Sequence, residues 1–308
     1  MISGLRPRFR WSSAGLHDFM RKLAPPCGYG PCGHAGSLWQ RARWRSRGVR
    51  MKGVRYCQTE CLELALAEIL ARARPAPHRS AISSHRIPLG LLLLSRQQLT
   101  AAQLRSALKA QRTAGCGKIG AWLQELGFVT EPQVTAALAR QWCCPVLLTG
   151  TPAIAVSRIA TIPALLLESF QMMPVEFTEA TGTLLVAFSE GIDYTVLYAI
   201  EQMLGYRTEA CLACPSTLRE GLRTLASQRN SSDIVFDGME DTAECARIIS
   251  SYSAKLEAVE VRVARCGAHL WVRFERLRQE TVNLVLTASR EAASGRHISP
   301  PKVLASAM

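Results

Sequence analysis

The feature that most constrains the fold is a sequence unit that occurs twice between Pro88 and Gln141, with an offset of 30 residues and no gap. Several positions repeat by identity, and others repeat their apolar character, as in Leu89/Ile119, Leu99/Val129 and Leu104/Val134. The repeated pairs include Gly90/Gly120, Leu93/Leu123, Thr100/Thr130, Gln103/Gln133, Leu108/Leu138 and Gln111/Gln141. Such a duplication indicates two copies of one supersecondary unit, each burying its apolar face against the other copy or against the next domain.

Each copy has the pattern of a short helix, a tight turn and a longer helix. In the second copy, the apolar residues of 119–126 have helical spacing, and Gly127 follows, where a left-handed residue would end the helix. Thr130 then predicts the cap of a second helix, and Gln133, three residues later, completes a capping box. The first copy repeats this logic with Thr100 as the cap.

The tandem motif resembles the N-terminal domain of type II secretion and type IV pilus assembly ATPases, over roughly residues 87–225. The resemblance implies a cyclic di-GMP site. Its guanines would need basic groups and apolar helix faces, and its phosphates backbone N–H groups near a glycine or a helix start. The residues implied for this site are Arg86, Leu89, Gly90, Leu93, Leu104, Leu108, Gln111, Lys118, Ile119, Gly120, Leu123, Gly127, Leu138 and Gln141.

Three departures from the family pattern bear on that site. Pro88 stands where the family has Arg, and Gln97 stands where it has Gly. Lys118 replaces the second Arg and lacks its planar fork. Arg86, two residues before Pro88, is a candidate substitute. A scaffold without a ligand, either a helical bundle or an adaptor, therefore remains the alternative.

The rest of the chain predicts an α+β protein. Residues 51–86 read as a helix and a linker, and residues 87–150 as the duplicated helix-turn-helix bundle. Residues 151–227 predict a small α/β domain with the order ββαβα, and residues 228–288 a further small α+β module. Residues 289–308 have the composition of a disordered tail.

The net charge of +13 is concentrated in residues 1–50, which hold ten basic residues and one acidic residue. This arm therefore carries +9, and the other 258 residues carry +4. We interpret the arm as disordered, or as preceding a true start at Met51, and a nucleic-acid-binding arm is the third hypothesis. Neither a secretory signal nor an apolar run long enough to span a membrane is visible, which favours the cytoplasm.

Eleven cysteines are scattered along the chain, and most are expected to be reduced, buried thiols. Cys27, Cys32 and His34, together with Cys57 and Cys61, could supply zinc ligands. Because the two pairs have unmatched spacings, C-x4-C and C-x3-C, the sequence alone favours no metal site.

We find no pattern that predicts catalysis. A phosphate-binding loop needs G-x-x-x-x-G-K-[ST], and the nearest stretch, around Lys118, has Arg112 at the first glycine position and Ile119 at the last. The sequence thus predicts a non-enzymatic cytoplasmic adaptor or regulator that senses cyclic di-GMP through the tandem motif. The alternative is a protein–protein interaction module of secretion or pilus machinery with no nucleotide ligand.

Overall fold

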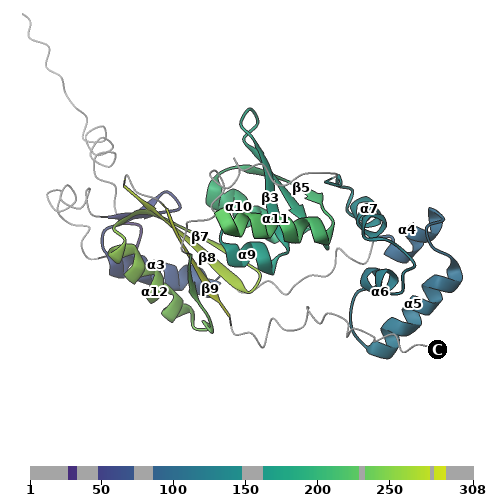
Figure 1. Ribbon diagram of the computed structural model, residues 1–308. Coiled ribbons are helices and arrows are strands. Elements are labelled where there is room, and N and C mark those ends of the chain that lie inside the picture. Colours follow the sequence, from purple (N-terminus) through teal and green to yellow (C-terminus); the bar gives the residue numbers. More distant parts are fainter. Residues whose placement is uncertain are drawn as a thin grey trace, which may run out of the picture. The chain divides into compact units, whose positions relative to one another are not determined.

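The computed structural model describes residues 27–32, 48–72, 86–147, 162–228, 233–277 and 281–288. The chain divides into two compact units, and Figure 1 labels many of their helices and strands. The fold class is α+β, as the sequence predicted. No helix within the described ranges is both long and apolar enough to cross a membrane. The first unit comprises Met1–Arg74, Asp241–Arg262 and Arg273–Thr281, and the second comprises Pro75–Glu240, Val263–Val272 and Val282–Met308.

The first unit contains a short hairpin whose first strand has two partners. β1 (Val49–Met51) pairs antiparallel with β2 (Val54–Tyr56) and parallel with β7 (Ala258–Cys266). The turn between β1 and β2 has positive φ at Lys52 and Gly53, which suits the twist of a two-residue hairpin. The boundary between the units falls inside β7 and inside β8 (His269–Arg276).

Two helices distant in sequence pack together in the first unit. They are α3 (Thr59–Arg72) and α12 (Thr242–Lys255), and Ser250 Oγ donates a hydrogen bond of 2.8 Å to the carbonyl oxygen of Thr59. The sequence predicts these helices in two separate segments, 51–86 and 228–288. The structure joins them because each buries an apolar stripe that a local pattern cannot match to its partner.

Residues 27–32 and 48–50 differ from the expectation of a disordered arm through residue 50. Val49 and Arg50 lie in β1, and the backbone N–H of Gly28 donates to the carbonyl oxygen of Arg55 at 2.7 Å. These residues are ordered by strand partners from β2 and from β7, far along the chain. The other residues of the arm, His34 and the expected tail at 289–308 lie outside the described residues.

Four helices of the second unit follow the duplicated sequence. The caps of the two longer helices match the prediction: Thr100 N donates to Gln103 Oε1 at 2.9 Å, and Thr130 N donates to Gln133 Oε1 at 2.8 Å. Both capping boxes are therefore confirmed. The helices are α4 (Leu89–Ser95), α5 (Ala101–Ala114), α6 (Ile119–Glu125) and α7 (Glu131–Trp142).

A three-stranded sheet with the order β3-β4-β5 forms the other main part of the second unit. β3 and β4 are antiparallel, whereas β4 and β5 are parallel. The order of elements from β3 onward is ββαβα, and the side chains of Leu184, Val186 and Phe188 on β4 are fully buried. The elements are α9 (Ala164–Ser169), β3 (Met172–Thr178), β4 (Thr183–Phe188), α10 (Tyr194–Leu204), β5 (Arg207–Leu212) and α11 (Pro215–Gln228).

The second unit also contains the parallel pair β6 (Ile234–Phe236) and β9 (Val282–Thr287). Buried polar groups tie these strands to their surroundings. Trp271 Nε1 donates to Asn283 Oδ1 at 3.1 Å, and Asp233 Oδ2 accepts a 2.9 Å hydrogen bond from the backbone N–H that begins α9. Buried polar groups are stable only when they find partners, so these contacts fix where β9 and α9 lie.

Candidate functional site

Helices of one sequence copy pack on helices of the other copy. α5 of the first copy packs on α6 of the second, and α4 of the first copy packs on α7 of the second. Gln111 Nε2 donates to the carbonyl oxygen of Gly117 at 2.8 Å, and Gln141 Nε2 donates to the carbonyl oxygen of Ile87 at 2.6 Å. Both the donors and the acceptors are 30 residues apart. The same contact is therefore made twice in opposite directions, which defines a pseudo-twofold pair.

The two repeated glycines allow the helices to approach closely. A Cβ at Gly90 would lie 2.7 Å from Leu104 Cδ1, and a Cβ at Gly120 would lie 3.1 Å from Val134 Cγ1. Leu104 and Val134 are themselves equivalent positions of the two copies. The shared core of the four helices consists of Leu89, Leu93, Leu99, Ala107, Leu123, Val129, Val134 and Ala137.

The structure separates the candidate ligand-binding residues by accessibility. Those that are buried pack the core, so they can act on a ligand only through the positions of the helices; they are Leu89, Gly90, Leu93, Gly120 and Leu123. Lys118 and Gly127 are exposed. The others are partly accessible at the domain surface; they are Arg86, Leu104, Leu108, Gln111, Ile119, Leu138 and Gln141.

Both candidate cations have partners within the second unit. Lys118 Nζ forms an ion pair and hydrogen bond with Glu190 Oε2, which lies in the loop after β4. The side chain of Lys118 is nonetheless 66% exposed, so a charged ligand could compete for it. The guanidinium of Arg86 stacks on the ring of Trp142, with its Cζ 3.2 Å from the ring centroid. This stacking orients Arg86 and leaves the edge of its planar fork to make hydrogen bonds.

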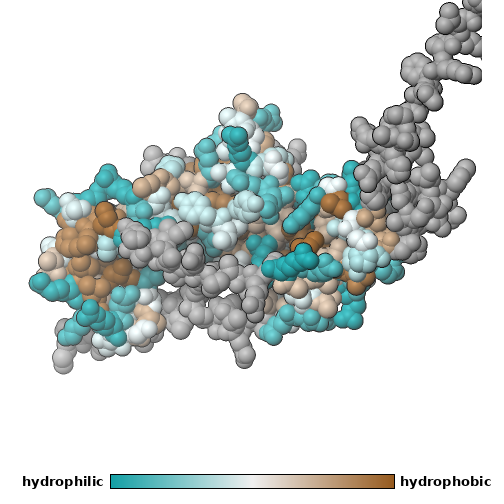
Figure 2. Space-filling model, turned by 180° about the vertical axis from the view of Figure 1, so that it is seen from behind, coloured by the Kyte–Doolittle hydropathy of each residue, from teal (hydrophilic) through white to brown (hydrophobic). Residues whose placement is uncertain are grey.

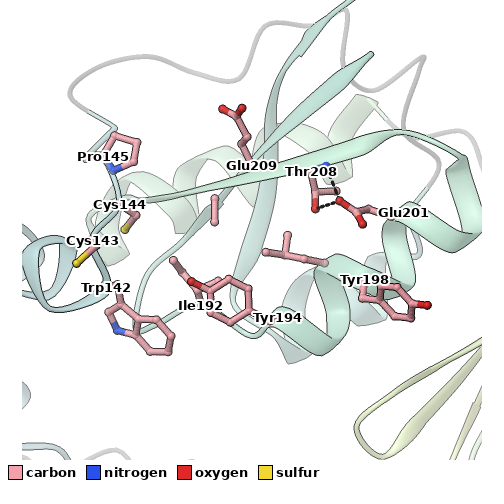
Figure 3. Close-up of a pocket in the computed structure, with 12 residues that line it drawn as sticks. Trp142, Cys143, Cys144, Pro145, Ile192, Tyr194, Tyr198, Glu201, Thr208 and Glu209 are labelled. Atoms are coloured by element: carbon pink, nitrogen blue, oxygen red, sulfur yellow. Dashed lines mark hydrogen bonds between the residues drawn. The ribbon is translucent and has the colours of Figure 1, made fainter. Parts of the chain in front are cut away.

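Trp142 also forms one wall of an open pocket of about 510 Å³ (Figure 3). The ring of Tyr194 lies beside Trp142, with a centroid separation of 6.3 Å, and the side chain of Tyr198 is 62% exposed. Glu201 accepts hydrogen bonds of 2.9 Å from both the backbone N–H and the hydroxyl of Thr208. The pocket can therefore receive a flat or apolar group against its aromatic wall.

The pattern of residues in the sequence did not predict this pocket. The available signal was the spacing of Tyr194 and Tyr198, which puts two aromatic rings on one face of a helix. Cys143 and Cys144 also line the pocket, and burial raises the pKa of the Cys144 thiol.

The helical domain also presents apolar side chains to solvent. Hydrophobic residues gather on the part of the surface that these helices form (Figure 2). The large apolar side chains exposed here are Ile87, Leu91 and Leu126, with exposed fractions of 58%, 53% and 38%. We call these three side chains the apolar surface of the helical domain. A contiguous exposed apolar patch often marks a binding site.

Comparisons with known proteins give matches among solved structures. A structure of MshE with cyclic di-GMP matches 46% of this chain and 99% of its own, with 27% identity and a TM-score of 0.39. Two crystal forms of the N-terminal domain of XpsE each match 48% of this chain and 97% or 98% of their own, with 20% and 22% identity and TM-scores of 0.35 and 0.28. No protein-family model matches the chain, and no curated protein matches it.

These solved structures fall within the group that the tandem motif predicted, so the chain is similar to the N-terminal domains of secretion and pilus ATPases. All three TM-scores are below 0.4. We therefore base the functional proposal on the contacts of this chain itself.

Proposed function

We propose that this chain is a non-enzymatic cytoplasmic adaptor of secretion or pilus machinery that binds cyclic di-GMP on its duplicated helical domain. The observation that carries the proposal is the reciprocal pair of hydrogen bonds made by Gln111 and Gln141. This pair relates the two copies by a pseudo-twofold axis. Cyclic di-GMP consists of two identical halves, so a protein surface made of two equivalent halves can contact both in the same way.

The surface chemistry of the helical domain supports this ligand class. Ile87 and Leu91 expose apolar surface on which a guanine ring could lie. Arg86 and Lys118 supply a positive charge next to the first helix of each copy, which suits the acceptor edge of guanine or a phosphate oxygen.

Calorimetric titration of the full chain with cyclic di-GMP tests the proposal. We expect saturable binding with one ligand per duplicated domain, or two if the ligand is stacked on itself. Lys118→Ala should weaken binding at least tenfold, because it removes a charge-assisted contact worth about 1.5–3 kcal/mol. Lys109→Ala is the matched control, because Lys109 is an exposed lysine on α5 outside the proposed site, and it should bind like the wild type.

The second candidate function is a protein interaction module without a small-molecule ligand. The observation that favours it is that both glutamines and Lys118 already have partners within the chain. A titration without heat at about 1 mM ligand would select this candidate. Leu91→Asp, which adds a charge to the apolar surface of the helical domain, should then impair secretion or piliation in cells while the circular dichroism of the purified variant stays unchanged.

A further inference from the structure

Four cysteine side chains meet in the first unit. The Sγ atoms of Cys27, Cys32, Cys57 and Cys61 all lie within 4.8 Å of one another. The Sγ–Sγ distance is 3.5 Å from Cys32 to Cys57, 3.7 Å from Cys57 to Cys61, and 3.6 Å from Cys61 to Cys32. A disulfide would need about 2.05 Å. Four thiolates around a tetrahedral zinc ion, each with a Zn–S bond of about 2.3 Å, are about 3.8 Å apart.

We propose that Cys27, Cys32, Cys57 and Cys61 bind one structural zinc ion. An all-sulfur, tetrahedral donor set suits zinc rather than the oxygen-preferring cations. Four protein ligands close the coordination sphere and leave no position for a substrate, which is the arrangement of structural zinc sites rather than catalytic ones.

A tight turn delivers the first two ligands. The backbone N–H of Cys32 donates to the carbonyl oxygen of Tyr29 at 3.1 Å, which folds residues 27–32 back on themselves. Gly28 donates to the carbonyl oxygen of Arg55 at 2.7 Å and so fastens the turn to β2. A Cβ at Gly28 would lie only 2.1 Å from Val54 Cγ1, so only glycine fits at this approach.

The end of β2 and the start of α3 deliver the other two ligands. Cys57 directly follows β2, and Cys61 lies in the first turn of α3, four residues later. Both side chains are buried, with 7% of each exposed. Buried thiolates need a compensating positive charge, and a bound Zn²⁺ would supply it.

The site would hold three segments of the first unit together. It joins residues 27–32, the β1–β2 hairpin and α3 at one point. The core of this unit is small, and small folded units commonly depend on a metal or disulfides for stability. The metal site thus gives the segment before β1 a structural role that is independent of the cyclic dinucleotide proposal.

Element analysis of the full chain, purified without added metal and without chelator, tests the proposal. We expect one zinc per chain, and a stoichiometry near zero for both Cys32→Ser and Cys61→Ser. Cys143→Ser is the matched control, because Cys143 is an exposed thiol of the second unit, and this variant should keep its zinc. Wild-type stoichiometry in both cluster variants would overturn the proposal.

A second measurement covers the case in which the cluster variants do not fold. Co²⁺ exchanged into the wild-type chain should give the sulfur-to-cobalt charge-transfer and intense d–d absorption of a tetrahedral thiolate site, and a thiol-modifying reagent should release one zinc per chain. A wild-type protein without zinc, one that holds iron instead, or one whose mass shows these four cysteines oxidised to disulfides would each contradict the zinc site.

Discussion

At the residue scale, the space between helices limits the size of the side chains in the helical domain. Gly90 and Gly120 are buried, and each lies against the longer helix of its own copy. At Gly120 a Cβ would approach both Val134 Cγ1 and Leu89 Cδ2 at 3.1 Å. The repetition of glycine at this position therefore has a packing reason, whether or not a ligand also requires it.

Gly120→Val should lower the free energy of unfolding by about 2 kcal/mol, because its extra methyl groups overpack the contact with Leu89 and Val134. Urea unfolding followed by circular dichroism measures this loss. Ala102→Val is the control, since Ala102 is exposed on α5 and the same side chain there costs only helix propensity, up to about 0.7 kcal/mol. Equal losses in the two variants would show that Gly120 is not tightly packed.

His269 gives a pH-dependent prediction at the same scale. Burial lowers the pKa of its imidazole below the ordinary 6.5, although the charge of Asp237 opposes this shift. The ring packs edge-on against Phe170, and within the described part of the chain its buried Nδ1 has no hydrogen-bond partner. The folded state therefore favours the neutral imidazole, which is the form present at pH 7 and above.

The imidazole of His269 has a lower pKa in the folded state than in the unfolded state, so on acidification the unfolded chain takes up this proton at a higher pH. The stabilising contribution of the neutral imidazole should therefore be fully present above pH 6.5 and fall as the pH drops through and below that value. His269→Phe should unfold with a weaker dependence on pH between 7.5 and 5.5, as measured by thermal denaturation at each pH. If the variant loses stability as steeply as the wild type, another group causes the acid sensitivity.

At the element scale, the exchange of helices explains why the duplicated unit is stable as a pair. Each short helix has seven residues and could not persist alone in water, so it depends on the longer helix of the other copy. The equivalent hydrogen bonds of Gln111 and Gln141 tie the end of each longer helix to the residue two positions before the other copy's short helix.

Gln111→Ala and Gln141→Ala should therefore destabilise the chain by similar amounts, about 1 kcal/mol each, since each removes one hydrogen bond to a backbone carbonyl. Chemical unfolding of the two variants and of the double variant measures the losses. Gln124→Ala is the control, since the described structure shows no side-chain hydrogen bond there, and its loss should be smaller. A large loss in only one of the two variants would contradict an exchange of equivalent contacts.

At the scale of the whole molecule, the chain builds its two units from segments that are far apart in sequence. β1 pairs with β7, and α3 packs against α12, so the first unit forms only when residues 48–72 meet residues 241–262. The second unit has its own core, which includes Phe188, Ile200 and Trp271. A perturbation of the cysteine cluster should consequently be confined to the first unit.

Chelation of the proposed zinc should raise amide hydrogen exchange in β1, β2 and α3, while exchange in α4–α7 changes little. Hydrogen exchange with mass spectrometry, with and without a chelator, measures this difference. The peptides of α4–α7 are the internal control. A uniform increase along the chain would show that the metal stabilises more than the first unit, and no change would count against a structural role for it.

The sequence by itself determined the local features. The duplication, the caps at Thr100 and Thr130, and the strands and helices of residues 164–228 follow from periodicity and from capping chemistry, which act over a few residues. The exposure of the candidate site residues could not be read in this way. Leu89 and Leu91 are both apolar residues of α4, yet one is buried and the other is 53% exposed, because only the packing of α4 decides which side faces the core.

Only the tertiary structure decided the long-range features. The cysteine spacings are unmatched and argued against a metal site, but a turn at residues 27–32 that docks on β2 brings all four Sγ atoms together. The arm before Met51 contributes to β1, which pairs with the neighbouring β2 and also with β7, more than two hundred residues later in the chain. Contacts of this kind depend on which distant segments meet and not on the local pattern of residues. The sequence therefore identified the cysteines and the arm, but it did not predict which residues they contact.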